Sequence, residues 1–101
     1  MTTPSSTWTF LSNHAHVMIL LGQDPDLRMR DLADRIGVTE RAVQRIVAEL
    51  SAAGYVEVQK EGRRNHYRVR RDLQLRHPVE AGVQVGALLD LVDQTQNVAD
   101  G

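Results

Sequence analysis

The chain has 101 residues, 42% of them hydrophobic and 25% charged, which predicts one globular domain with a modest core and argues against disorder. It has no cysteine, which excludes disulfides and thiolate metal sites and fits a reducing compartment. The N-terminus lacks the features of a signal peptide, and the longest apolar run, residues 17–21, is far shorter than the roughly 20 residues of a membrane span. We therefore expect a cytoplasmic protein with no membrane partner.

The charges are unevenly distributed along the chain. The formal net charge is −1, a balance that by itself speaks against a nucleic-acid partner. Between residues 27 and 71, however, eleven basic and six acidic residues leave a net charge of +5, and the acidic excess lies outside this stretch. A local positive surface attracts a phosphate backbone whatever the charge of the whole chain.

A first helix is predicted from about residue 13 to residue 21. Ser12 is a suitable N-cap, and Gly22 is suited to end the helix. The segment has little polar surface, so we expect it to be mostly buried. Pro25 forbids continuation of the helix and predicts a turn over residues 23–26.

A helix-turn-helix pattern follows. Residues 27–29 are compatible with a short strand, and residues 31–36 with a second helix. Gly37 suits the left-handed position at a helix end, which lets the chain turn sharply. Thr39 is a good N-cap for a third helix that runs to about Ala53. The apolar side chains of this third helix recur at helical spacing and should be buried: Val43, Ile46, Val47 and Leu50.

The opposite face of the third helix carries Arg41, Gln44, Arg45 and Ala48 at the same helical spacing. Arginine can donate to guanine O6 and N7, and glutamine can pair with adenine N6 and N7, in the major groove of DNA. Ala48 is small and would allow close approach to the backbone. The alternative is that this is only a solvated helix face.

Residues 55–59 and 65–69 alternate as expected for the two strands of a hairpin, with a tight turn at Glu61-Gly62. Arg63 and Arg64 would lie at or beside the tip, where a projecting loop can reach a neighbouring minor groove or its phosphates. The alternative is that these charges only keep an edge strand soluble. The side chains expected to point inwards are Val56, Val58, Tyr67 and Val69.

Residues 72–78 should be irregular, and residues 82–95 fit a last helix. One small domain cannot easily cover all the large apolar side chains near both ends, and an exposed apolar patch usually marks an interface. We therefore expect a homodimer joined through residues 1–11 and 79–98. The alternative is that the last helix packs on its own chain. The candidate interface residues are Trp8, Phe10, Leu11, Leu88, Leu89 and Val92.

An ordered set of short motifs runs through residues 29–69. It consists of Leu32-Ala33, Ile36-Gly37-Val38-Thr39, Val43, Val47, Leu50, Ala53-Gly54-Tyr55-Val56, and Gly62-Arg63-Arg64 before Tyr67. In this order the motifs resemble the winged helix-turn-helix domain of bacterial regulators of the MarR and ArsR type. The resemblance implies that the third helix enters the major groove of double-stranded DNA and that the hairpin, the wing, touches the adjacent minor groove.

By position, the resemblance assigns two sets of DNA-binding residues. The major-groove set is Thr39, Glu40, Arg41, Gln44 and Arg45. The wing and backbone set is Arg28, Arg30, Arg63, Arg64, Asn65 and His66. There are departures from the family pattern. Arg30 stands where the family usually has a serine or threonine N-cap, Glu40 would repel phosphate unless it accepts from a cytosine amino group or points away, and the cysteine motif of the metal-sensing ArsR members is missing.

The expected fold is mainly α with a small β-hairpin wing (α+β): a three-helix core, a two- or three-stranded sheet and a C-terminal helix. It forms a single domain over residues 1–101, with a DNA-binding core over residues 12–71. The expected function is sequence-specific transcriptional regulation; the alternative is a winged-helix protein-interaction module that does not bind DNA.

No catalytic motif, phosphate loop or cofactor motif occurs, so we expect neither an enzyme nor a bound cofactor. His14 and His16 point to different sides of a helix and cannot share one metal there, although a site shared across a dimer stays open. The sequence does not identify a small-molecule effector.

Overall fold

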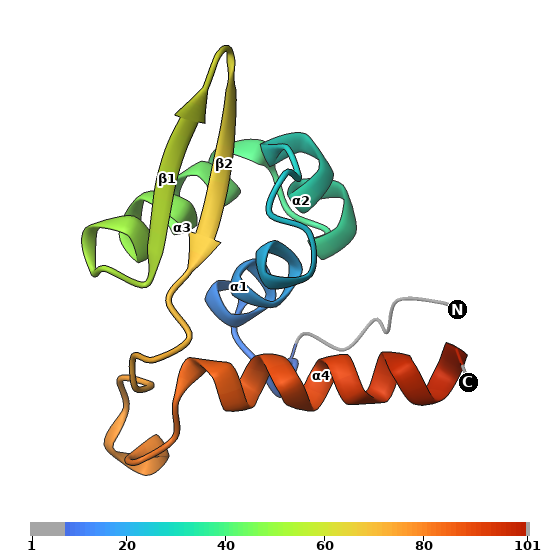
Figure 1. Ribbon diagram of the computed structural model, residues 1–101, viewed down its shortest axis with the longest axis vertical. Helices are drawn as coiled ribbons and strands as arrows, with labels where there is room; N and C mark the ends of the chain where they lie inside the picture. Colours follow the sequence, from blue (N-terminus) through green and yellow to red (C-terminus); the bar gives the residue numbers. More distant parts are fainter. Residues whose placement is uncertain (1–7, 101) are drawn as a thin grey trace.

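The computed structural model describes the backbone of residues 8–100 and the side chains of residues 8–93. Three helices and a hairpin form the body, and a long last helix crosses at the end opposite to the hairpin tip (Figure 1). This is the predicted winged helix-turn-helix, with a sheet of two strands. The elements are α1 (Asn13–Gln23), α2 (Met29–Ile36), α3 (Glu40–Ala52), β1 (Val56–Glu61), β2 (Arg64–Val69), a 3₁₀ turn (Pro78–Glu80) and α4 (Val85–Asp100).

Helix α1 begins as predicted but ends later. The Ser12 hydroxyl accepts a hydrogen bond from the Ala15 N–H at 3.2 Å, which caps the helix. The helix continues through Gly22 to Gln23, and Asp24 is the C-cap. Gly22 does not have the positive φ of a left-handed C-cap. It is instead a packing position: a Cβ placed on Gly22 would lie 3.1 Å from Leu89 Cδ1 of α4. The prediction that Gly22 terminates the helix was therefore wrong.

Helix α2 starts at Met29, so the predicted strand over residues 27–29 is absent from the described structure. The Asp31 carboxylate accepts a hydrogen bond from the Arg28 N–H at 3.1 Å, which caps the helix from within its first turn. Arg28 is thus the N-cap, so Arg30 lies inside the helix and not at the cap position that the family resemblance implied. Gly37 has the left-handed conformation that the sequence predicted, with φ of 88°.

The predicted apolar stripe of α3 lies in the core. Val43, Ile46, Val47 and Leu50 are all buried, and they pack with side chains of α1, α2, β1 and α4. No polar or charged side chain is buried among the described residues. The core therefore packs the helices together mainly through apolar contacts. The largest fully buried side chains are Leu21, Leu32, Val17, Val43, Val56 and Val85.

The hairpin alternates as predicted and its turn is slightly shifted, but its inward face is only partly covered. Val56 and Tyr67 are buried and Val69 is half-buried, whereas Val58 lies farther out along the wing and is 44% exposed, so the prediction that it is directed into the core was wrong. Val56 faces Val69 and Val58 faces Tyr67 across the ladder, and Glu61 pairs with Arg64 as the last step. The turn residues are consequently Gly62 and Arg63 rather than Glu61 and Gly62. Gly62 has a positive φ of 64°, which suits the first position of a two-residue hairpin loop.

Helix α4 starts later than predicted, at Val85. The backbone before it is held extended against residues 73–75, with the Leu75 N–H bonded to the Val83 carbonyl and the Val85 N–H to the Leu73 carbonyl. Val85 and Leu89 are buried in the core, so the beginning of α4 does pack on its own chain. Among the described residues, no helix is both long and apolar enough to cross a bilayer.

Replacing Leu32 by alanine should lower the free energy of unfolding by about 2–5 kcal/mol, because a fully buried side chain leaves a cavity in the core. Urea unfolding followed by circular dichroism measures this. The control is Val79→Ala, which is 86% exposed and should change the free energy of unfolding by less than about 0.5 kcal/mol. Equal and small effects in the two variants would contradict the placement of Leu32.

Candidate nucleic-acid interface

The polar face of α3 is open to solvent. Arg41, Gln44 and Arg45 are exposed, and none of the three side chains has a hydrogen bond or ion pair with another described residue. Thr39 caps the helix by accepting from the Ala42 N–H at 3.1 Å, and Glu40 in the first turn is also exposed. The exposed face of α3 therefore presents two guanidinium groups and one side-chain amide whose N–H donors make no hydrogen bond within the described protein.

The arginines at the base of the hairpin, in contrast, are neutralised by acids. Arg68 and Arg70 lie 3.5 and 3.6 Å from the Glu57 carboxylate, and Arg70 also lies 3.1 Å from Asp72. The hydrogen bond between Arg70 and Asp72 lowers the pKa of Asp72 and raises that of Arg70. Arg71 is paired with an acid of α4. These ion pairs lower the positive potential at the hairpin base relative to cations that have no acid nearby.

A second group of cations has no acidic partner in the described structure. Most of these side chains lie at the hairpin tip, at the start of α2 and on the open face of α3, whereas Arg35 and Arg76 lie elsewhere. Because their charge is not neutralised, they make the surface attractive to phosphate. They include Lys60, Arg63, Arg28, Arg30, Arg41 and Arg45.

Two predicted wing contacts also hold the hairpin to the body. An Arg64 Nη2–H donates to the Asp26 carbonyl at 2.8 Å, and His66 Nδ1 lies 2.8 Å from the Asp26 carboxylate. Asn65, between them, is exposed and donates to the Tyr67 hydroxyl at 3.3 Å. The hairpin stands in front of α3 in Figure 1, with its tip projecting beyond the helices.

Comparison with known proteins agrees with this geometry. A family model described as the MarR family matches residues 9–64. The chain belongs to the MarR family. Members of this family are DNA-binding transcriptional regulators rather than enzymes, and of the two types that the sequence resembles, MarR is the one that matches.

Two solved structures are similar to this MarR-family chain. One is the adhesin competence repressor AdcR from Streptococcus pyogenes, with 18% identity and a TM-score of 0.58 over 89% of this chain and 63% of that chain. The other is the zinc-dependent MarR family transcriptional regulator AdcR in its Zn(II)-bound state, with 17% identity and a TM-score of 0.54 over 100% of this chain and 68% of that one. This chain thus spans 63% of the length of the first. At these identities the likeness shows the winged-helix fold, and no curated protein matches the sequence.

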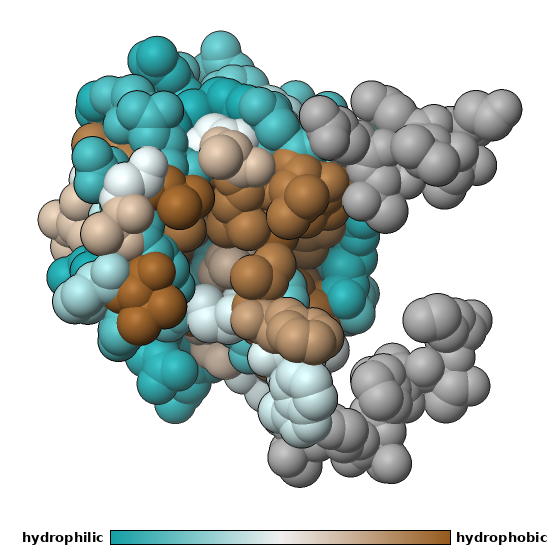
Figure 2. Space-filling model, turned by 90° about the horizontal axis from the view of Figure 1, so that it is seen from below, coloured by the Kyte–Doolittle hydropathy of each residue, from teal (hydrophilic) through white to brown (hydrophobic). Residues whose placement is uncertain are grey.

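The candidate dimer residues of this MarR-family chain are not equally accessible. Phe10 is 91% and Trp8 64% exposed, and their rings meet edge to face with centroids 4.9 Å apart. Leu88 and Val92 are half-buried, as is Leu11. Leu89 is only 6% exposed and packs in its own chain's core, so little of its surface is left for a partner. Figure 2 views the molecule from below relative to Figure 1, the side on which α4 lies, and shows hydrophobic surface gathered there.

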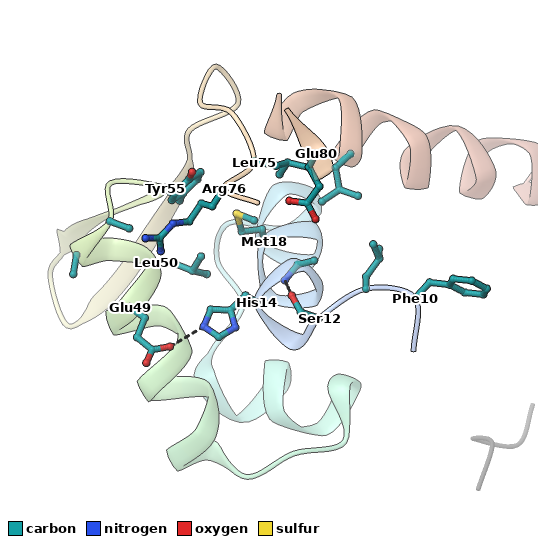
Figure 3. A pocket seen from close by; sticks show the side chains of 15 residues that line it. Phe10, Ser12, His14, Met18, Glu49, Leu50, Tyr55, Leu75, Arg76 and Glu80 are labelled. Atoms are coloured by element: carbon teal, nitrogen blue, oxygen red, sulfur yellow. Dashed lines mark hydrogen bonds and ion pairs between the residues drawn. The ribbon is translucent and has the colours of Figure 1, made fainter. Parts of the chain in front are cut away.

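An open hollow of about 980 Å³ could not be predicted from the sequence, because its walls come from segments far apart in the chain: residues 10–12, α1, the end of α3, residues 75–80 and α4. His14 and Glu49 face each other on one side of it, 2.7 Å apart, and Arg76 and Tyr55 lie on another (Figure 3). No group of three or more histidines, cysteines or acids suited to a metal occurs among the residues searched, which are the described ones.

Thr39→Ala should lower the free energy of unfolding by about 1 kcal/mol, because the Ala42 N–H loses its acceptor at the start of α3. Thr39→Ser keeps the hydroxyl and should behave like the wild type. Chemical denaturation of the three proteins measures the difference. A serine variant as unstable as the alanine variant would show that the methyl group, and not the cap, matters.

Proposed function

We propose that this chain is a sequence-specific regulator of transcription that binds double-stranded DNA with α3 in the major groove and the wing on the adjacent minor groove. The observation that carries the proposal is the division of the cations. The arginines at the hairpin base are paired with acids, whereas those on the open face of α3, at the start of α2 and at the wing tip have no acidic partner among the side chains that the structure describes. Unpaired cations on these elements suit a polyanionic ligand.

On α3, the proposed base contacts are Arg41, Gln44 and Arg45. Their helical spacing lets them project together while the apolar stripe stays in the core. A well-placed arginine or glutamine is worth about 1–3 kcal/mol of discrimination against a wrong base. Thr39 and Glu40 would lie at the groove-facing start of the helix, where Glu40 accepts from a cytosine amino group or turns away from phosphate.

The wing and the start of α2 would supply sequence-independent contacts. We assign Arg63, Arg64, Asn65 and His66 to the minor groove or its phosphates, and Arg28 and Arg30 to the backbone beside the major groove. Arg64 keeps further N–H donors beyond the one bonded to Asp26, since a guanidinium has five.

We further propose a homodimer joined through the terminal segments. Support comes from the exposure of Trp8 and Phe10 and from the half-buried Leu88 and Val92, which would gain from a partner surface. Two copies related by a two-fold axis would bind a pseudo-palindrome whose half-sites lie roughly one helical turn apart, about 34–36 Å.

The two proposed contact sets predict different defects. Arg63→Ala and Arg64→Ala should weaken binding to every duplex and lower the slope of log affinity against log salt by about one each. Gln44→Ala and Arg45→Ala should relax the choice of sequence, because they remove base contacts. Selection of bound duplexes from a random library gives the wild-type site, and gel-shift titration then compares the variants.

The control for charge is Arg76→Ala, an exposed arginine at the hollow rather than on the wing or α3. It should bind the selected duplex like the wild type. Unchanged affinity and sequence choice in all four test variants would overturn the proposal. If the wild type is retained neither on heparin nor on a random duplex at low salt, the protein-interaction module is favoured instead.

The dimer predicts a change of mass in solution. Phe10→Ser removes a 91% exposed aromatic side chain and should shift the protein from dimer towards monomer in sedimentation equilibrium. Val58→Thr, on the wing and 44% exposed, is the control and should leave the mass unchanged. A wild-type protein that sediments as a monomer at all accessible concentrations would remove the dimer from the proposal.

A further inference from the structure

We propose that Asp26, in the turn between α1 and α2, is a positioning residue for the wing: it sets the direction of the hairpin and through it the affinity for DNA. This inference rests on the proposed function, because it concerns how the wing reaches its ligand. Asp26 itself need not touch DNA. It lies 38 residues from Arg64 and 40 from His66 in the sequence, and only the fold brings the three together.

Three hydrogen bonds tie β2 to this turn. The Tyr67 N–H donates to the Pro25 carbonyl at 3.0 Å, Arg64 donates to the Asp26 carbonyl at 2.8 Å, and His66 Nδ1 lies 2.8 Å from the Asp26 carboxylate. Within the described structure the strands pair only with each other. A two-stranded hairpin is marginally stable in water on its own. Val56 and Tyr67 seat its base in the core, and its direction beyond that base depends also on hydrogen bonds of this kind.

The turn is itself well held, which makes it a suitable anchor. The Asp24 N–H donates to the Leu20 carbonyl at 2.9 Å, so the turn continues directly from α1. The Asp24 carboxylate accepts from the Asp26 N–H at 3.0 Å. Pro25 has a restricted φ. The anchor thus transmits the position of α1, which packs on α3, to the wing.

The tip lies far enough beyond the anchor to amplify a small movement. From His66 to the turn the strand advances about 10 Å, at about 3.3 Å per residue. A tilt of about 15° at His66 would then move Arg63 by about 2–3 Å, given that strand length. A charge-assisted hydrogen bond to phosphate does not tolerate such a shift. Loosening the anchor should therefore weaken the wing contacts without removing any of them.

Simple electrostatics predicts the opposite effect. Asp26 is an acid beside a wing that carries Arg63 and Arg64, Asp24 lies in the same turn, and the Asp26 side chain is 64% exposed. If it acted only through its charge, its removal would strengthen binding to a phosphate backbone. A positioning role is therefore distinguished by the sign of the change.

The decisive comparison is Asp26→Ala against Asp26→Asn. Both remove the charge, but asparagine keeps an oxygen that can accept from His66. We expect Asp26→Ala to weaken binding to the selected duplex about threefold to tenfold, on the scale of one lost hydrogen bond. Asp26→Asn should bind as well as the wild type or better. Equal strengthening in both variants would overturn the proposal.

The matched controls are Asp34→Ala and Asp34→Asn. Asp34 is an exposed acid of α2 whose side chain has no hydrogen bond or ion pair to another described residue. The two controls should have the same affinity as each other, because there is no acceptor role to lose. A difference between them as large as that between the Asp26 variants would also count against the proposal.

A second comparison separates positioning from direct contact by His66. His66→Ala should weaken binding more in the wild type than in Asp26→Ala, since the part of its effect that runs through Asp26 is already lost there. If His66→Ala costs the same in both backgrounds, His66 acts on DNA by itself and the role assigned to Asp26 is wrong.

A measurement without DNA tests the anchor directly. The Tyr67 amide should exchange its hydrogen several-fold faster in Asp26→Ala than in Asp26→Asn, while the midpoints of thermal unfolding stay equal. Unchanged protection of Tyr67 in Asp26→Ala would overturn the anchor even if that variant binds DNA more weakly than the wild type. A wild type that binds no duplex would instead overturn the proposed function, and the claim about affinity with it.

Discussion

Burial of the apolar stripe of α3 is the constraint on which the rest of the structure depends. Val43, Ile46, Val47 and Leu50 must lie inwards to form the core. Since successive residues of a helix are rotated by a fixed angle, the opposite side chains are then directed to solvent. The same packing thus stabilises the domain and decides which face of α3 is offered to a ligand.

The pairing of charges adds a second level of order to this arrangement. Glu57 and Asp72 neutralise the arginines near the hairpin base, so positive potential is concentrated at the tip and on the helices instead of being spread along the wing. The whole-chain charge of −1 conceals this pattern. A DNA-binding surface can therefore exist on a chain of slightly negative net charge, because phosphate responds to the local field within about 8 Å at physiological salt.

The last helix serves the core and a surface at once. Val85 and Leu89 are buried against the body, with Leu89 seated on Gly22, whereas Leu88 and Val92 remain half-exposed. The sequence left two alternatives for this helix: it packs on its own chain, or it forms an interface with a partner. The two are compatible. The first holds for its buried side chains, and the second concerns the others.

The sequence by itself determined the local features: the caps at Ser12 and Thr39, the left-handed Gly37 and the buried stripe of α3. Each depends on residues within a few positions of one another, so composition and spacing suffice to predict it. Only the tertiary structure decided the role of Gly22, the hollow beside His14, and the contacts of Asp26 with β2. These join segments far apart in the chain, and no local periodicity records which distant side chains will meet when the core closes.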